Sequence, residues 1–589
     1  MMNKFKLLAL VMAILMIIPL VAACGLSDKP DDTAADTSDV ETFIDIVKDG
    51  KAAKIVYAVD AEAHEKEMAD KVKDSIFRNT GVTPECSYEM KYNASTVEIV
   101  IGDTTYPETE ELRKTLKYGE SAVKVMGNKI VVVGFDQASF ADAITKLLLE
   151  FTGKLDANKN IAISSKFHAV VAPNEILTKV PVLEGWVPTI TDTGDDCYML
   201  GFGKDKTKFD KYITLLESNG FKLYAEKEIE ENVYSTYTND EVVVTTIFTK
   251  WNKTCKILVE WLKNTELPTK AEENKYTPIE GLKSSITQVG LFYDVQVDKD
   301  GAMTNFNGMC YVIRLADGSF IIADGGHAEI QADNLYSVLK AQAPDEDNIT
   351  IAAWFFSHNH GDHTGFFTKF VEKYADKVNV EKFIYNFPSK EQGGYTTAQD
   401  TWKKLIKKEL GATFIKAHPG QEFYIRNAKI DMLYTMDVYE DELKDTNNAS
   451  IVWKMELEGK TFMCLGDYSE NGKHLMNLYS SEVLGSDIVQ MAHHGISGQN
   501  ANIYMQIQPE YAFWPVGAKH VKFWSNESLP DLQLDTLAIN SYFHVGKFDQ
   551  SKIFWAFDDV VVMTLDDGTV STKTYENVDN FKTNYKKIY

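Results

Sequence analysis

Residues 349–365 read ITIAAWFFSHNHGDHTG, and this stretch decides the fold. The apolar run 349–356 predicts a buried strand, because it is short, uninterrupted and bounded by turn-forming residues. A helical pattern follows over 366–374. The junction between strand and helix therefore carries four ligand-type side chains, namely His358, His360, Asp362 and His363.

The spacing of these four residues predicts two adjacent metal positions. His358 and His360 are two residues apart and can point to the same side of an extended chain. Asp362 and His363 turn toward a second position as the helix begins. Imidazole and carboxylate ligands suit Zn²⁺, with Mn²⁺ or Fe²⁺ as alternatives, and a catalytic site keeps one position for water. A solvated loop is the alternative, but the flanking strand and helix favour two divalent ions.

The pattern HxHxDH after a buried strand resembles the metallo-β-lactamase superfamily. The resemblance implies a C-terminal αββα sandwich. It also implies that Asp324, which closes FIIAD, orients a ligand histidine, and that Asp467, at the end of KTFMCLGD, bridges both metals. The last histidine of the family then falls in DIVQMAHHG, as His493 or His494.

The GD followed by HHG, together with the preceding segment 447–467, is similar to one branch of that superfamily. This branch contains competence-type DNA-internalisation proteins and the pneumococcal-type phosphorylcholine esterase. We expect His494 to be a ligand and His493 a second ligand or a proton donor, although neighbours cannot be separated by sequence. The resemblance implies the metal ligands His358, His360, Asp362, His363, Asp467 and His494, and the catalytic residues Asp362, Asp467 and His493.

One departure from the family concerns the first metal. Many members carry a further histidine after the strand that is here AKIDMLYT, but residues 434–445 contain none. His418 precedes that strand and is interpreted as a loop histidine. The first metal is then expected to have fewer histidines or to use His493.

The remaining histidines of this half are interpreted mainly as solvated surface residues: His327, His474, His520 and His544. His520 and His544 follow the HHG, where the branch places substrate-facing loops, so either can donate a proton or bind phosphate. Aromatic residues in 517–527 and 543–559 can form a cation–π box for a quaternary amine, although core packing is the commoner role of such clusters.

The rest of the chain predicts an α/β multidomain protein, because 589 residues exceed what one core normally supports. Segments 42–166 and 167–276 predict two small α/β or α+β domains, the first with a pattern similar to N-terminal domains of some carbohydrate-active enzymes. A proline-marked stretch then leads to the hydrolase domain, 284–589, which holds ten of the twelve histidines. Aromatic residues of the second domain are interpreted as core or interface.

The N-terminus predicts export. Lys4 and Lys6 precede an apolar run from Leu7 to Ala23, and residues 21–24 read VAAC. This end resembles a bacterial lipoprotein signal (1–23) whose Cys24 becomes lipidated, followed by a flexible tether (24–41); a single membrane span is the alternative. The protein is therefore expected to be extracytoplasmic and anchored to the membrane.

The net charge and the spacing of the cysteines exclude several classes of function. A formal net charge of -25 disfavours nucleic-acid binding, and six widely spaced cysteines without a CxxC pair indicate neither a zinc ribbon nor a dense disulfide framework. We expect a binuclear hydrolase whose metals activate water to attack a phosphodiester or related ester, either a small molecule or derived from the cell wall. The alternatives are a surface nuclease for DNA uptake and a glycan-binding lipoprotein with a structural metal.

Overall fold

The computed structural model describes residues 41–291, 308–439, 443–469, 473–495, 499, 501–515, 548–555 and 559–587. The predicted signal peptide, Cys24, nearly all of the tether, His520 and His544 lie outside these ranges. Among the residues described, no helix is both long and apolar enough to cross a membrane.

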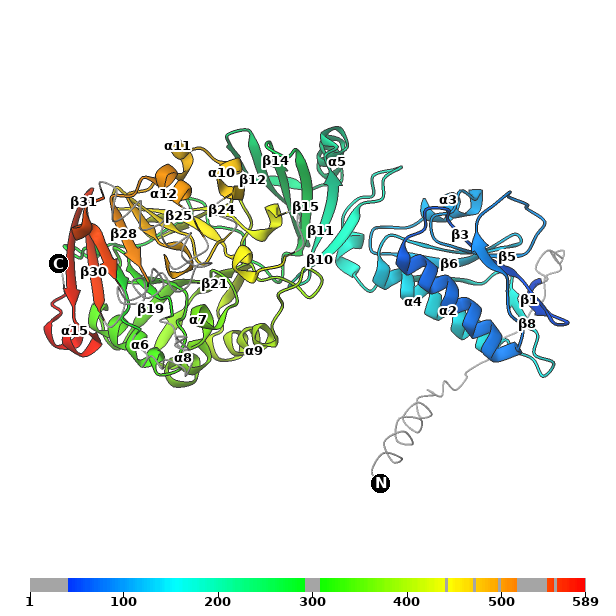
Figure 1. Ribbon diagram of the computed structural model, residues 1–589, viewed down its shortest axis with the longest axis horizontal. Coiled ribbons are helices and arrows are strands. Elements are labelled where there is room, and N and C mark those ends of the chain that lie inside the picture. Colours follow the sequence, from blue (N-terminus) through cyan, green and yellow to red (C-terminus); the bar gives the residue numbers. More distant parts are fainter. Residues whose placement is uncertain are drawn as a thin grey trace, which may run out of the picture.

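The first domain is an α/β unit, drawn in blue at one end of the molecule in Figure 1. Its main sheet has the order β4 (Cys86–Tyr88), β3 (Lys54–Tyr57), β5 (Glu98–Ile101), β7 (Lys129–Gly134), β6 (Ser121–Met126) and β9 (His168–Val171). A smaller sheet joins β2 (Lys51–Ala52), β1 (Phe43–Lys48) and β8 (Ile161–Ser164). Helices α2 (Ala63–Thr80) and α4 (Gln137–Gly153) pack their apolar sides on these sheets, while α3 (Pro107–Arg113) contacts β7. Strand β9 pairs with β6, so the main sheet continues past the expected boundary at residue 166.

The second domain is an antiparallel sheet with one helix. Its order is β10 (Thr189–Gly194), β11 (Cys197–Gly203), β15 (Thr254–Trp261), β14 (Val242–Thr249), β13 (Asn232–Thr238) and β12 (Lys222–Ile229). Helix α5 (Lys206–Ser218) packs on one face with Ile257, whereas Leu258 packs on the other face against the C-terminal domain. Neighbouring residues of a strand point to opposite faces, so two buried faces explain the apolar strands of this domain. Its buried Tyr234 and Tyr237 lie in interface and core, as expected.

Two sheets packed face to face form the C-terminal domain. The first has the order β22 (Thr413–Lys416), β21 (Lys382–Tyr385), β19 (Ile349–Phe355), β18 (Phe320–Ala323), β17 (Tyr311–Arg314), β16 (Ser284–Gln288), β30 (Val560–Asp566) and β31 (Thr569–Tyr575), with β20 (Val378–Val380) beside β19. The second has the order β23 (Glu422–Ile425), β24 (Ala428–Tyr434), β25 (Val452–Leu457), β26 (Lys460–Cys464), β27 (Ile488–Gln490), β28 (Tyr511–Trp514) and β29 (Ile553–Trp555). Side chains such as Ile286, Phe355 and Trp453 fill the space between them.

Helices cover both outer faces of this pair of sheets. The first sheet is covered by α6 (Gln331–Gln342), α8 (Phe367–Tyr374), α9 (Thr397–Leu405) and α15 (Val578–Asn584), whose apolar residues share one cluster with it. The second is covered by α10 (Lys473–Leu478), α11 (Ser481–Leu484) and α12 (Ala501–Ile507). The expected αββα sandwich is therefore confirmed, within a mixed α/β multidomain protein (Figure 1).

The sandwich places four strand ends at one edge. Strands β18 and β19 are parallel neighbours in the first sheet, and β26 and β27 are parallel neighbours in the second. Their carboxyl ends lead directly to Asp324, His358, Asp467 and the pair His493 and His494. Parallel strands end at the same edge, so residues more than a hundred positions apart meet there.

Candidate metal centre

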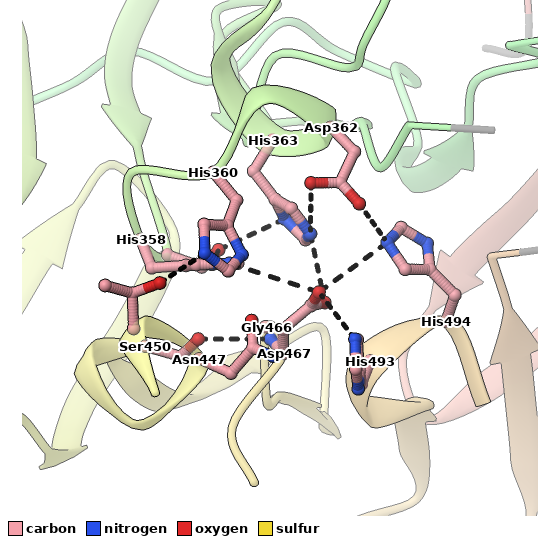
Figure 2. Close-up of polar contacts among 12 residues, drawn as sticks. His358, His360, Asp362, His363, Asn447, Ser450, Gly466, Asp467, His493 and His494 are labelled. Carbon is pink, nitrogen blue, oxygen red and sulfur yellow. Dashed lines mark hydrogen bonds and ion pairs between the residues drawn. The ribbon is translucent and has the colours of Figure 1, made fainter. Parts of the chain in front are cut away.

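The HxHxDH segment leaves β19 and enters the short helix α7 (Gly361–Thr364), for which His360 is the N-cap residue. His358 and His363 are fully buried, and their ring centroids are 4.3 Å apart. The ring of His360 lies 4.6 Å from that of His358. Figure 2 shows the three imidazoles beside one another; the spacing predicts two adjacent positions, one served by His358 and His360 and the other by Asp362 and His363.

Asp324 fixes the geometry of the HxHxDH segment through its contacts with Ser357 and His363. Its carboxylate accepts hydrogen bonds from the backbone N–H of Ser357 at 2.7 Å and from the Ser357 hydroxyl at 2.9 Å. The second oxygen also lies 2.7 Å from Nδ1 of His363. With Nδ1 held in this way, Nε2 of His363 points into the centre, which is the orienting role expected for Asp324.

Asp467 lies in the middle of the cluster. Its Oδ1 is 3.0 Å from Nε2 of His363, and its Oδ2 is 4.0 Å from Nε2 of His358 and 3.6 Å from Nε2 of His494. The side chain is 1% exposed. The carboxylate of Asp467 thus faces His358, from the predicted first metal position, as well as His363 and His494, as a bridging acid must (Figure 2).

The structure separates the neighbours His493 and His494. Nε2 of His494 lies 3.1 Å from Oδ2 of Asp362, and its other nitrogen lies 3.2 Å from the carbonyl oxygen of Pro515. His494 therefore completes a group of four ligand atoms with Asp362, His363 and Asp467. His493 stands at the rim with its side chain 32% exposed, and its Nε2 is 3.9 Å from Oδ2 of Asp467.

Two glycines let the backbone make these turns. Gly466, before the bridging acid, has φ 56°, and a Cβ there would lie 2.6 Å from Cβ of Ser357. Gly495, after the histidine pair, has φ 67°, and its Cβ would lie 1.9 Å from Nε1 of Trp514. The glycines of the GD and HHG motifs are thus required by close packing as well as by positive φ.

The buried charges influence one another. Burial lowers the pKa of His358 well below its usual value, so this imidazole is neutral and free to bind a cation. Burial alone would raise the pKa of Asp467, but His363, His494 and His493 hold it well below its usual range. The pKa of Asp362 is likewise depressed by His363 and His494 against the effect of burial. Both carboxylates are therefore ionised at neutral pH.

Unsatisfied atoms at the centre fit a bound metal. Nε2 of His358, Nε2 of His363 and Oδ1 of Asp467 are buried and make no hydrogen bond of acceptable geometry, although the last two atoms lie 3.0 Å apart. Buried polar atoms are normally satisfied, so three such atoms converging on one space call for a ligand. Imidazole nitrogens and ionised carboxylates are the donors that zinc, manganese and iron accept. The residues present thus fit divalent metal ions.

The first metal position has an unusual neighbour. Short helix η4 (Thr446–Ala449) follows the segment 434–445, which lacks the family's further histidine, and the Thr446 hydroxyl contacts Nε2 of His360. Oδ1 of Asn447 is buried without a hydrogen-bond partner. Sequence reasoning missed this segment, because threonine and asparagine before a strand carry no metal signature of their own.

The other histidines are placed as follows. His327 is exposed, as expected. His474 was expected at the surface, but it is 4% exposed and its ring packs against Trp251 and Tyr439, because α10 turns it toward the second domain. His418 lies in a loop, as expected, but in a separate buried cluster. The proposed aromatic segment 517–527 lies outside the described residues, whereas Phe554 is buried in the core and the partly buried Trp555 stacks on Trp514.

Residues 303–431 match the family model of the metallo-beta-lactamase superfamily. The match includes Asp324 and the whole HxHxDH segment. The chain thus contains a metallo-β-lactamase superfamily domain. Asp467, His493 and His494 lie beyond the matched residues, and the distances given above bring them to the same centre. A comparison with curated proteins gave no match.

Several solved structures are similar to this chain. The metallo-beta-lactamase fold protein YhfI from Bacillus subtilis has 12% identity and a TM-score of 0.26, covering 39% of this chain and 85% of that one. CmlA, a diiron beta-hydroxylase from Streptomyces venezuelae, has 11% identity and a TM-score of 0.29, covering 50% and 55%. The flavodiiron protein from Giardia intestinalis has 12% identity and a TM-score of 0.20, covering 46% and 60%. The chain spans less than two thirds of the length of the beta-hydroxylase and of the flavodiiron protein.

Proposed function

We propose that this protein is an extracytoplasmic, membrane-anchored hydrolase that uses two divalent metal ions, most simply Zn²⁺, to cleave a phosphodiester or a related ester. The observation that carries the proposal is the convergence of three buried atoms that make no hydrogen bond of acceptable geometry. They are Nε2 of His358, Nε2 of His363 and Oδ1 of Asp467. His360, Asp362 and His494 extend this set to six side chains, with the carboxylate of Asp467 at its centre.

The ligand set divides into two groups that share Asp467. His358, His360 and Asp467 would hold one ion; Asp362, His363, Asp467 and His494 would hold the other. Such ions would lower the pKa of a water molecule and polarise the substrate oxygen under attack. The first group has one protein ligand fewer, which leaves room there for water and substrate.

The protein's own groups then orient the reactants. Asp362 and Asp467 are ionised and can accept hydrogen bonds from the attacking water, which fixes its direction. His493 is the exposed member of the centre, so its Nε2 can meet a substrate and exchange a proton with the leaving group. Asp324 holds His363 and contributes through that residue.

The substrate class is supported by charge and by the sequence branch. The GD and HHG motifs resemble a branch that includes a phosphorylcholine esterase, and a net charge of -25 disfavours polyanionic nucleic acid. A small or cell-wall-derived phosphodiester, such as a choline-decorated polymer, fits both. The VAAC sequence supports anchoring through a lipidated Cys24.

The enzymatic proposal is tested by metal analysis and hydrolysis with the same preparations. Metal content is measured by mass spectrometry, and bis-p-nitrophenyl phosphate and p-nitrophenyl phosphorylcholine are the substrates. We expect the hydrolytic centre of the wild type to hold two metals, counted as the difference in metal content from Asp467→Ala, with loss of activity in His360→Ala and Asp467→Ala. His168→Ala, which replaces an exposed histidine of the first domain, is the control and should keep both. A wild type that binds no metal and is no more active than His360→Ala and Asp467→Ala would refute the proposal.

Anchoring is tested separately in a bacterial expression host. We expect the wild type in the membrane fraction with an acylated N-terminal cysteine detected by mass spectrometry. Cys24→Ser should lose the acyl group. An unacylated wild type would refute the lipoprotein assignment without affecting the hydrolase assignment.

A further inference from the structure

A second cluster of ionisable side chains lies between the second domain and the catalytic domain, apart from the candidate metal centre. Ligand atoms of Cys197, Glu260 and His418 lie within 4.8 Å of one another. Their relative exposures are 0%, 6% and 0%. A thiol, a carboxylate and an imidazole converging in a buried place form a donor set suited to zinc.

The sheet of the second domain supplies two of these donors. Strands β11 and β15 are antiparallel neighbours, and Tyr198 pairs with Val259. The next positions outward are Cys197 and Glu260, which therefore face each other across the strand pair. The two side chains are brought together by regular sheet geometry, which needs no loop to position them.

The catalytic domain supplies the imidazole and fixes its orientation. Nδ1 of His418 lies 2.8 Å from Oδ2 of Asp437, so Nε2 faces the second domain at 2.7 Å from Oε2 of Glu260. Asp437 is itself held by the side-chain amide of Asn386 at 2.8 Å and the hydroxyl of Thr435 at 2.6 Å. A carboxylate behind a histidine is the usual support of a metal ligand.

We propose that Cys197, Glu260 and His418 bind a divalent transition-metal ion of the zinc class, which joins the second domain to the catalytic domain. This site is independent of the hydrolytic centre. Ligand atoms around tetrahedral zinc are roughly 3.3 Å apart, so His418 and Glu260 need to separate by only about 0.6 Å. A cavity lined by Glu260, Tyr385 and Lys416 reaches the Glu260 side of the cluster, from which an ion and a water as fourth ligand would enter.

The charges of the cluster also accommodate a divalent ion. Burial lowers the pKa of His418, but Glu260 and Asp437 outweigh it and raise that pKa to about 9, so the metal-free imidazole is protonated. Burial raises the pKa of the Cys197 thiol well above its usual value, so the bound ion has to displace the thiol proton. A divalent ion would replace one proton on Cys197 and one on His418, leaving the net charge unchanged.

Cobalt substitution of the full-length protein tests this proposal, because thiolate bound to Co²⁺ gives a charge-transfer band in the near ultraviolet. The hydrolytic centre contains no cysteine, so such a band reports the second site alone. We expect the band in the wild type and in Asp467→Ala. It should disappear in Cys197→Ser and in Glu260→Gln, each of which should also bind one zinc fewer than the wild type.

Cys255→Ser is the matched control, since Cys255 is a buried cysteine of the same sheet, on β15. It should keep the band and its zinc. A wild type without the band, or a band that survives in Cys197→Ser, overturns the site. Loss of hydrolysis in Asp467→Ala with an intact band would show that the two proposals stand separately.

Discussion

Oδ2 of Asp324 lies 2.7 Å from Nδ1 of His363; Asp324 directly follows strand β18, whereas His363 lies in helix α7, which follows the neighbouring strand β19. The aspartate is 1% exposed, so the contact is shielded from water. Burial raises the pKa of this carboxyl, while His363 and the two donors of Ser357 act against that rise. The pair sets the direction in which Nε2 of His363 presents its lone pair.

The first prediction concerns this pair. Asp324→Asn should weaken metal binding by about 10- to 100-fold, because the orienting acceptor of a ligand histidine is lost. Metal dissociation constants from competition with a chromogenic chelator measure the effect. Asp333→Asn, at an exposed position of α6, is the control and should bind as the wild type does. Equal affinities for all three proteins would contradict the role of Asp324.

The second prediction separates the two neighbouring histidines. His494→Ala should lose the metal held with Asp362 and His363, because it removes a buried ligand 3.1 Å from Asp362. His493→Ala should keep that metal and lose turnover, by about 10²- to 10⁴-fold if Nε2 transfers a proton. Metal content and kcat are measured on the same samples. The reverse pattern would exchange the two assignments.

The third prediction concerns the glycine before the bridging acid. Gly466→Ala should destabilise the protein by about 1–3 kcal/mol from backbone strain, with a further cost from the contact with Ser357. Gly411→Ala is the matched control, since Gly411 also has positive φ but nothing within 4 Å of its Cβ position. Urea unfolding measures both variants. An equal loss of stability in the two would show that the packing against Ser357 is unimportant.

The fourth prediction concerns pH-dependent ion pairs between the second domain and the C-terminal domain. Nζ of Lys227 lies 2.5 Å from Oε1 of Glu422 and from Oδ1 of Asp431. Partial burial would raise the pKa of Glu422, but Lys227 and Lys429 bring it down to about 2. The folded pKa is thus below the ordinary value of 4.5, so the stabilisation is complete above that pH and is lost as pH falls toward 2.

Lys227→Met should therefore lower stability at about pH 6, and the difference from the wild type should shrink by about pH 3. Denaturant midpoints at the two pH values measure this change. Lys250→Met is the control, because Lys250 pairs with Glu231 at an exposed position where ion pairs contribute little. A difference that is constant with pH would rule out Glu422 as its source.

Much of the C-terminal half could be predicted from local sequence. The apolar run at 349–356 forms β19, the pattern at 366–374 forms α8, and the aspartate of FIIAD follows β18, because strand and helix periodicities are local properties. The sequence could not place His474, whose burial depends on Trp251 of another domain. Nor could it place Thr446 beside His360, since no ligand pattern marks that threonine.

By itself, the sequence determined which residues can bind metal at the end of β19 and in what order, because their spacing along one strand and one helix is fixed by backbone geometry. Only the tertiary structure decided how His493 differs from His494, since adjacent residues of one motif differ by the direction each takes at positive φ. Only the tertiary structure brought Cys197, Glu260 and His418 together, because that contact arises when two separately formed sheets pack against each other.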